Sequence, residues 1–103
     1  MNYVWYNGNY LPADEFSIGY RDRLFLYGDG LFESIYVRHT KARLLGHHLD
    51  RLQQGCNTLR INFPTALVAA PEIISELARR NTVDQVGKCK IHVWRQAGGA
   101  LCT

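Results

Sequence analysis

The distribution of apolar and polar positions predicts that the chain opens with a β-hairpin. Residues 3–6 and 9–11 are aromatic and apolar runs, and they flank the pair Asn7-Gly8. Both residues of an Asn-Gly pair tolerate positive φ, which the tight turn of a two-residue hairpin requires. Residues 12–20 are then expected to form a loop, because proline, aspartate and glycine interrupt any hydrophobic period there.

The run from Leu31 to Arg38 predicts a strand with two different faces, since it is rich in β-branched and aromatic residues. One face carries Leu31, Glu33, Ile35 and Val37, and the other carries Phe32, Ser34, Tyr36 and Arg38. A carboxylate among apolar neighbours needs a partner when it is buried, so Glu33 is expected to have one. Residues 39–41 are expected to turn, and residues 42–45 to return as a short strand.

Two helices are predicted from the spacing of apolar residues. The first covers roughly residues 46–60, where one apolar stripe runs through Leu45, Leu49, Leu52, Cys56 and Leu59. The second covers roughly residues 65–80, and its buried face consists of Ile73, Ile74, Leu77 and Ala78. Pro71 falls inside this second window, so either the helix starts there or it kinks. Asn81 is expected to end it.

Residues 88–95 alternate cleanly and predict a strand with one core face and one polar or cavity face. The core face carries Cys89, Ile91 and Val93, and the opposite face carries Lys88, Lys90, His92 and Trp94. Residues 96–103 are expected to be a glycine loop. Strands, two helices and a further strand in this order predict the α+β class.

Composition narrows the possible classes of protein. The 103 residues suffice for one small domain, and 47% hydrophobic with 20% charged residues is typical of a globular chain. The net charge of +3 suits an anionic ligand and does not indicate nucleic-acid binding. No apolar run is long enough to span a bilayer and no secretory signal is recognisable, so a cytoplasmic protein is expected. Three cysteines without close pairs argue against a zinc site, and Cys56 and Cys89 are predicted core thiols.

Three short segments carry residues suited to chemistry. Gly28-Asp29-Gly30 precedes a strand and lacks the lysine of a phosphate-binding loop, so on its own it indicates a tight turn. Arg51 either belongs to a solvated helix face or binds an anion, because a guanidinium offers a planar fork of donors to phosphate. The adjacent His47 and His48 point in different directions and cannot easily share a metal. Residues 95–99 end in glycines, which either connect two elements or let the backbone approach a ligand.

Taken together, these segments resemble the class IV (fold-type IV) pyridoxal-phosphate enzymes. The resemblance lies in Tyr-Gly-Asp-Gly-Leu-Phe-Glu at residues 27–33, a basic hairpin, Leu-Leu-x-x-His-Leu-x-Arg-Leu at residues 44–52, and Lys-Ile-x-Val-Trp-Arg-x-x-Gly-Gly at residues 90–99. That family includes branched-chain and D-amino-acid aminotransferases and 4-amino-4-deoxychorismate lyase. It implies that residues 1–103 form the small N-terminal two-layer domain of the D-amino-acid aminotransferase-like fold, an antiparallel sheet with two helices on one face.

The resemblance also implies roles for individual residues. Arg51 matches the family arginine that binds the phosphate of the cofactor, pyridoxal 5'-phosphate. Glu33 matches a glutamate beside the active site, and Tyr27 and Phe32 would face the substrate side of the cofactor ring. The substrate pocket would thus include Tyr27, Phe32, Glu33, Lys90 and Trp94, with His48 nearby.

The chain departs from the family pattern in two places. Ala100 and Cys102 stand where the substrate loop of D-amino-acid aminotransferases carries an arginine and a histidine, which argues against D-amino-acid specificity. The same alanine replaces an arginine of the lyases, although Gly98-Gly99 matches them. The Schiff-base lysine is expected beyond Thr103, in a larger C-terminal domain. The 103-residue segment is therefore expected to be a fragment without a catalytic residue and inactive alone.

The expected function is that of the N-terminal part of a homodimeric aminotransferase. Such an enzyme moves an amino group between an amino acid, branched-chain or other, and a 2-oxo acid. The first alternative is 4-amino-4-deoxychorismate lyase of the 4-aminobenzoate pathway, and the second is a complete small binding domain without catalysis. No nucleic-acid, membrane or metal partner is expected.

Overall fold

The computed structural model describes residues 2–22, 24, 27–95 and 99–102, with the backbone alone for the last four. It confirms the opening hairpin, in which β1 (Tyr3–Tyr6) pairs antiparallel with β2 (Asn9–Pro12). Asn7 and Gly8 have positive φ, at 46° and 95°, as the two-residue turn requires. One turn of 3-10 helix, η1 (Ala13–Glu15), and a loop follow.

Six strands form one sheet in the order β2-β1-β6-β5-β3-β4, and all neighbours pair antiparallel. At its centre, β3 (Gly30–Arg38) and β5 (Val86–Trp94) match residue for residue along their whole length. The strands β4 (Lys41–Ala42) and β6 (Gly99–Cys102) are short. The predicted glycine loop is wrong for β6, because this segment pairs its backbone with both β1 and β5. Residues 96–98 and 103 of that prediction lie outside the described residues.

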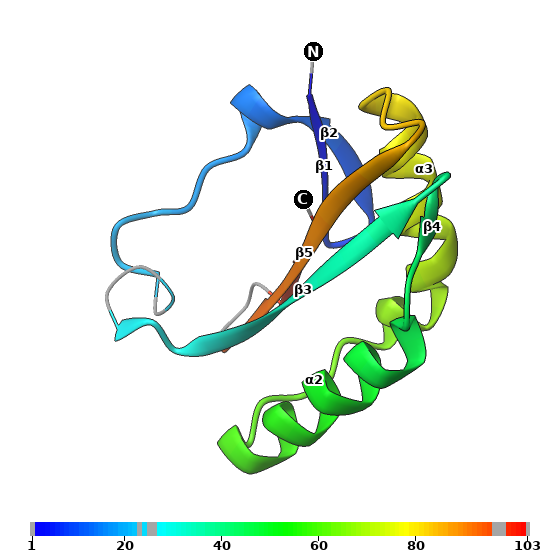
Figure 1. Ribbon diagram of the computed structural model, residues 1–103. Helices are drawn as coiled ribbons and strands as arrows, with labels where there is room; N and C mark the ends of the chain where they lie inside the picture. The colour runs from blue at the N-terminus through cyan, green and yellow to red at the C-terminus, as the bar shows by residue number, and fades with distance from the viewer. Residues whose placement is uncertain (1, 23, 25–26, 96–98, 103) are drawn as a thin grey trace.

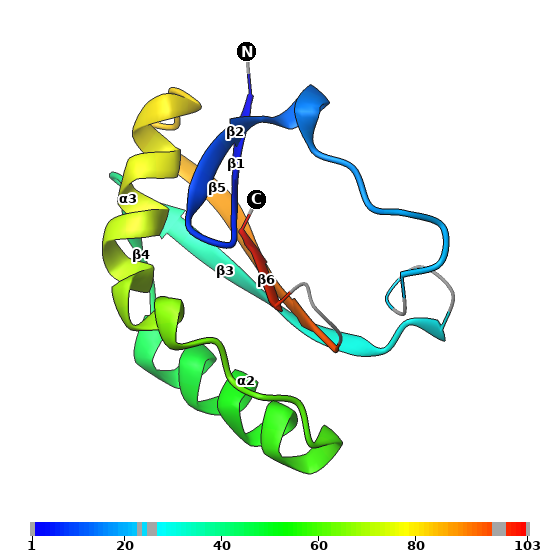
Figure 2. The same ribbon diagram turned by 180° about the vertical axis from the view of Figure 1, so that it is seen from behind.

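Two α-helices, α2 (Leu45–Leu59) and α3 (Ala70–Arg80), cover the same face of the sheet (Figures 1 and 2). The 3-10 helix η2 (Thr65–Ala69) precedes α3, so Pro71 lies in the first turn of α3 and produces no kink. Asn81 caps α3, as predicted. The predicted strand over residues 42–45 is wrong beyond Ala42, because α2 already begins at Leu45. The α+β class with two helices on one face of an antiparallel sheet is confirmed.

The core lies between the sheet and the two helices. Its fully buried residues include Ile35, Leu52, Ile74, Ile91 and Val93, which confirms the predicted inner faces of both strands and both helices. Cys56 and Cys89 are buried in the core, as predicted, and burial raises the pKa of the Cys56 thiol. Leu59 departs from the predicted stripe at 42% exposure, because α2 ends there and the chain turns through a left-handed Arg60.

A second, smaller apolar cluster lies on the other face of the sheet, at one end. Trp94 is its centre, and Val4 packs against it together with Phe16, Ile18 and Leu24 from the segment after β2. The prediction that Trp94 belongs to a polar or cavity face is wrong in this respect: its side chain is 1% exposed and stacks on Tyr6. Residues 13–22 run along this side of the sheet, opposite the helices (Figures 1 and 2).

Neither α2 nor α3 covers the rest of that face, and we call it the open face. It consists of the outward side chains of β3 and β5, namely Phe32, Ser34, Tyr36, Arg38, Lys88, Lys90 and His92. Phe32 and Tyr36 are about half exposed there. The molecule thus has a packed side toward the helices and an accessible side away from them.

Candidate functional site

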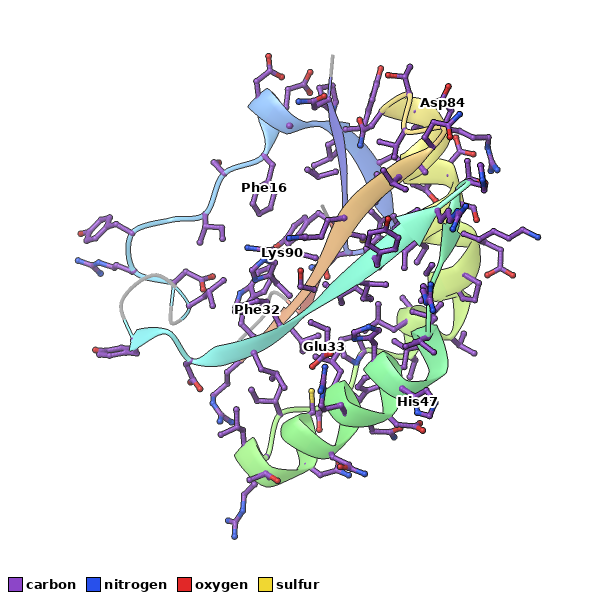
Figure 3. The ribbon with its side chains drawn as sticks, in the orientation of Figure 1. Phe16, Phe32, Glu33, His47, Asp84 and Lys90 are labelled. Carbon is purple, nitrogen blue, oxygen red and sulfur yellow. The ribbon has the colours of Figure 1, made fainter. Side chains whose placement is uncertain are left out.

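Glu33 is the one charged residue that is buried among the described parts of the chain, at 9% exposure. It lies on the helix side of β3 between the apolar residues Leu31 and Ile35, so strand alternation places its carboxylate against α2. Figure 3 shows Glu33 between β3 and α2. Such a position requires charged or hydrogen-bonding partners.

Two residues of α2 supply these partners. His48 and Arg51 are three residues apart, a spacing that places both on the flank of α2 facing β3. His48 Nδ1 lies 2.7 Å from Glu33 Oε1. Arg51 donates from Nη2 to Oε1 at 2.8 Å and from Nε to Oε2 at 3.1 Å, so the guanidinium holds both carboxylate oxygens. The expectation that a buried Glu33 has a partner is confirmed.

These contacts fix the charge of the cluster. The hydrogen bond from Arg51 lowers the pKa of Glu33, burial acts in the opposite direction, and the hydrogen bond from His48 lowers it further. The same carboxylate raises the pKa of Arg51. At neutral pH the cluster therefore contains an ionised Glu33 beside a fixed guanidinium.

Arg51 keeps one side open to a ligand. Its side chain is 71% exposed although it grips Glu33. The bonds to Glu33 use Nε and Nη2, and no acceptor for Nη1 occurs among the described residues. A guanidinium that is held from behind and exposed in front can bind an oxyanion without a large loss of side-chain entropy. Arg51 is thus the residue of the cluster best suited to a phosphate or a carboxylate.

The other predicted site residues lie on different sides of the sheet. Phe32 and Lys90 are on the open face (Figure 3), where Lys90 Nζ lies 5.2 Å from the centre of the Phe32 ring. His92 packs beside them, 5.3 Å from the same ring, and its pKa is lowered by burial and then by Lys90. Tyr27, in the segment before β3, is 69% exposed, whereas Trp94 is buried. The structure therefore brings together Glu33, His48 and Arg51, and separately Phe32 and Lys90.

Sequence reasoning missed an ion pair between Asp29 and Arg95. Arg95 Nε donates to Asp29 Oδ2 at 2.7 Å, and its other two nitrogens donate to the carbonyls of Leu59 and Arg60 at 2.6 and 3.1 Å. Gly30 makes this junction possible, since a Cβ there would lie 2.6 Å from the carbonyl oxygen of Val93. The motif Gly-Asp-Gly was the available signal, but nothing local pairs Asp29 with a residue 66 positions later.

The described residues contain no group of three or more potential metal ligands. In the same part of the chain, no helix combines the length and hydropathy that a membrane crossing requires.

Comparison with known proteins agrees with this architecture. The family model described as "Amino-transferase class IV" matches residues 30–102. The aminodeoxychorismate lyase of Vibrio harveyi is 32% identical over 95 residues, covering 92% of this chain and 32% of that protein. The D-alanine aminotransferase of Staphylococcus haemolyticus is 23% identical over 87 residues, or 84% of this chain and 31% of that protein. The chain thus spans about a third of the length of these relatives.

Solved structures show the same fold. The branched-chain aminotransferase of the thermophilic archaeon Thermoproteus uzoniensis, with norvaline, superposes with a TM-score of 0.82 at 17% identity, covering 98% of this chain and 38% of that one. A hypothetical aminotransferase from Mycobacterium tuberculosis in its PLP-bound form also gives 0.82, at 22% identity, covering 97% and 38%. With most of its length matched by the family model, this chain belongs to the class IV amino-transferase family.

Proposed function

We propose that this chain is the N-terminal, phosphate-binding part of a pyridoxal 5'-phosphate enzyme that transfers an amino group between an amino acid and a 2-oxo acid. The observation that supports this most is Arg51, ion-paired to the buried Glu33 and exposed at its outer edge. The relatives that carry aminotransferase names, and the PLP-bound structure with the same fold, support the cofactor and the reaction class.

The chemistry of the donors fits the cofactor. A phosphate dianion in a partly dry pocket needs a cation, and a guanidinium suits its geometry. Glu33 would hold Arg51 in place, and His48 would hold Glu33 from its other side. When bound, pyridoxal phosphate supplies an electron sink for negative charge at the substrate carbon.

The remaining residues would shape the pocket. Tyr27 and Phe32 offer exposed aromatic surface for an apolar part of the substrate, and Lys90 offers a cation beside Phe32. Trp94 would support this wall from within, since it is buried. The proposal includes a lysine that binds the cofactor covalently, and it places this lysine in a second domain, outside the 103 residues. The proposed enzyme is a homodimer in the cytoplasm.

A second candidate is 4-amino-4-deoxychorismate lyase. It is supported by the 32% identity to the Vibrio harveyi enzyme, which extends over 92% of this chain. The two candidates use the same cofactor and differ in the substrate pocket. Cofactor binding alone therefore does not separate them.

The first experiment tests the cofactor site in the protein purified from its whole reading frame. Titration with pyridoxal phosphate, followed by absorbance, should give an affinity about 10- to 100-fold weaker for Arg51→Gln than for the unmodified protein, as for loss of a charge-assisted hydrogen bond. Arg79→Gln is the matched control, since Arg79 also pairs with a glutamate but lies on α3. Absence of cofactor binding in the unmodified protein would overturn the proposal and favour a binding domain without catalysis.

The second experiment separates the reactions. The same protein is incubated with aminodeoxychorismate alone, with leucine and 2-oxoglutarate, and with D-alanine and 2-oxoglutarate. We expect amino transfer from leucine. Product from aminodeoxychorismate alone would replace the aminotransferase by the lyase.

A further inference from the structure

A pocket of about 420 Å³ opens where β3, β4 and the start of α2 meet. Tyr36, Arg38, Arg43, Leu44 and His48 line it. It is separate from the exposed edge of Arg51, which is not among its lining residues. His48 connects the two places, because its ring also contacts Glu33.

The strand register explains why positive charge gathers here. Val37 lies opposite Ala42, and the backbone N–H of Arg43 donates to the carbonyl of Tyr36 at 2.8 Å, so Tyr36 and Arg43 are cross-strand neighbours. Arg38 is two residues beyond Tyr36 on the same face, which is the open face. On the neighbouring strand β5, Lys88 lies opposite Tyr36. Tyr36 is therefore flanked by cations from both neighbouring strands.

No ion pair within the described residues involves Arg38 or Arg43. The carboxylates that form ion pairs in this part of the chain are Glu33, Glu76 and Asp29, and each pairs with an arginine or histidine other than Arg38 and Arg43. The first turn of α2 adds no acidic residue. Arg38 even lies directly opposite Lys41, an arrangement of like charges that destabilises a strand pair.

The backbone at the pocket is also strained, at a cost to the stability of the fold. Leu44 adopts a left-handed conformation with φ of 57°, which side chains other than glycine, asparagine and aspartate rarely take, and its side chain is 60% exposed. Such conformations concentrate at ligand-binding sites. Charge, strain and a concave surface thus coincide at one place.

We propose that this pocket binds a small dianion, with Arg38 and Arg43 as the main contacts and the Tyr36 hydroxyl as an additional donor. Two guanidinium groups on one pocket match two negative charges, and each offers a planar fork to an oxyanion. The ligand is a dicarboxylic acid or a phosphate, which share this chemistry. The site does not depend on pyridoxal phosphate or on Arg51.

The experiment is a calorimetric titration of the purified protein, with the proposed cofactor site saturated by pyridoxal phosphate, with three probes, 2-oxoglutarate, inorganic phosphate and pyruvate. At least one dianion should bind at least 10-fold more tightly than the monoanion pyruvate. Binding by 2-oxoglutarate alone identifies a dicarboxylate site, and binding by phosphate alone identifies a phosphate site. Either result supports the pocket as a dianion site when the variants below respond as expected.

Arg38→Gln/Arg43→Gln should weaken the preferred dianion at least 10-fold. Arg21→Gln/Arg79→Gln removes the same charge from exposed positions elsewhere and should leave the affinity within a factor of two. Arg51→Gln should also leave it unchanged, which distinguishes this site from the proposed cofactor site. The thermal midpoint of the Arg38→Gln/Arg43→Gln variant without ligand should not fall, because like charges have been removed.

Equal affinity of that double variant and the unmodified protein, or loss of dianion binding in Arg51→Gln, would overturn the inference. Failure of cofactor binding, with dianion binding intact, would instead overturn only the proposed function.

Discussion

Among the described residues, two arginines pair with largely buried carboxylates, and the two pairs differ in how many guanidinium nitrogens stay without a partner. Each of the three guanidinium nitrogens of Arg95 donates a hydrogen bond: Nε donates to Asp29, and the other two donate to two carbonyls at the end of α2. Arg51 contacts Glu33 with two of its nitrogens and is 71% exposed, against 37% for Arg95. Both pairs join a guanidinium to a carboxylate, but only Arg51 keeps a nitrogen, Nη1, without an acceptor among the described residues.

This difference distinguishes an arginine that stabilises the fold from an arginine that can bind a ligand. Arg95 joins the loop before β3, the end of β5 and the last carbonyls of α2, whose unpaired acceptors favour a cation. Arg51 joins one strand to one helix and still presents a charged edge to solvent. We therefore expect substitutions around Arg95 to lower the free energy of unfolding, and substitutions at Arg51 to lower the affinity for an anion.

The sharpest test of the structural side is Gly30→Ala, and we expect it to have the largest effect on stability. The new Cβ would lie 2.6 Å from the carbonyl oxygen of Val93 and 2.7 Å from Cβ of Trp94, neither of which can rotate away. Overpacking of this kind should lower the free energy of unfolding by about 1–3 kcal/mol, measured by urea titration.

Gly46→Ala is the matched control for this substitution. Gly46 lies in α2 with nothing within 4 Å of an added Cβ, so the same change should stabilise the protein by about 0.5–1 kcal/mol. Equal effects of the two alanines would show that the close approach of β3 to β5 at Gly30 has no energetic role.

Arg95→Gln should have the next largest effect. It removes the ion pair to Asp29 and two hydrogen bonds to the end of α2. The Arg95 side chain is 37% exposed, so solvent weakens these contacts. We expect the free energy of unfolding to fall by about 1–2 kcal/mol in urea titrations. Unchanged stability would contradict the structural assignment of this arginine.

Arg51→Gln should lower stability less than Arg95→Gln, because most of the Arg51 side chain is already in water and His48 still contacts Glu33. Its main effect should be the 10- to 100-fold loss of cofactor affinity proposed above. The comparison would be reversed if Arg51→Gln proved the more destabilising of the two and left cofactor affinity intact.

Local patterns predicted most of the fold. The Asn7-Gly8 turn, the stripe on α2 and the two faces of β3 and β5 follow from neighbours within one element, and the structure agrees with them. Trp94 shows the limit of alternation, which tells which face a residue occupies but not what covers that face. The short strand β6 was missed because its pairing with β1 depends on segments at opposite ends of the chain.

The site was predictable in part for the same reason. A carboxylate on an apolar face shows that Glu33 needs a partner, and the sequence alone cannot say that Arg51 and His48 provide it. The family resemblance selected Arg51 as a phosphate ligand, a role that stays a prediction. The motif Gly-Asp-Gly marks Asp29 but does not reveal its pairing with Arg95, since the two residues meet only through the register of β3 with β5.

The smallest expected effect concerns the pH dependence of the Glu33 cluster. Because the folded pKa of Glu33 is lowered, chiefly by Arg51, its contribution to stability is present at neutral pH and is lost as pH falls through that lowered pKa. The difference in unfolding free energy between the unmodified protein and Glu33→Gln should therefore be largest near pH ~7 and shrink toward pH ~3, below the ordinary glutamate pKa of about 4.3. Glu76→Gln, which removes a more exposed carboxylate whose pKa is also lowered, should show a weaker dependence, since solvent screens that pair. A difference for Glu33→Gln that stays constant over this range would mean that the side chain of Glu33 contributes to stability through packing and not through its charge. The ion pair with Arg51 would then not be what holds the guanidinium in place.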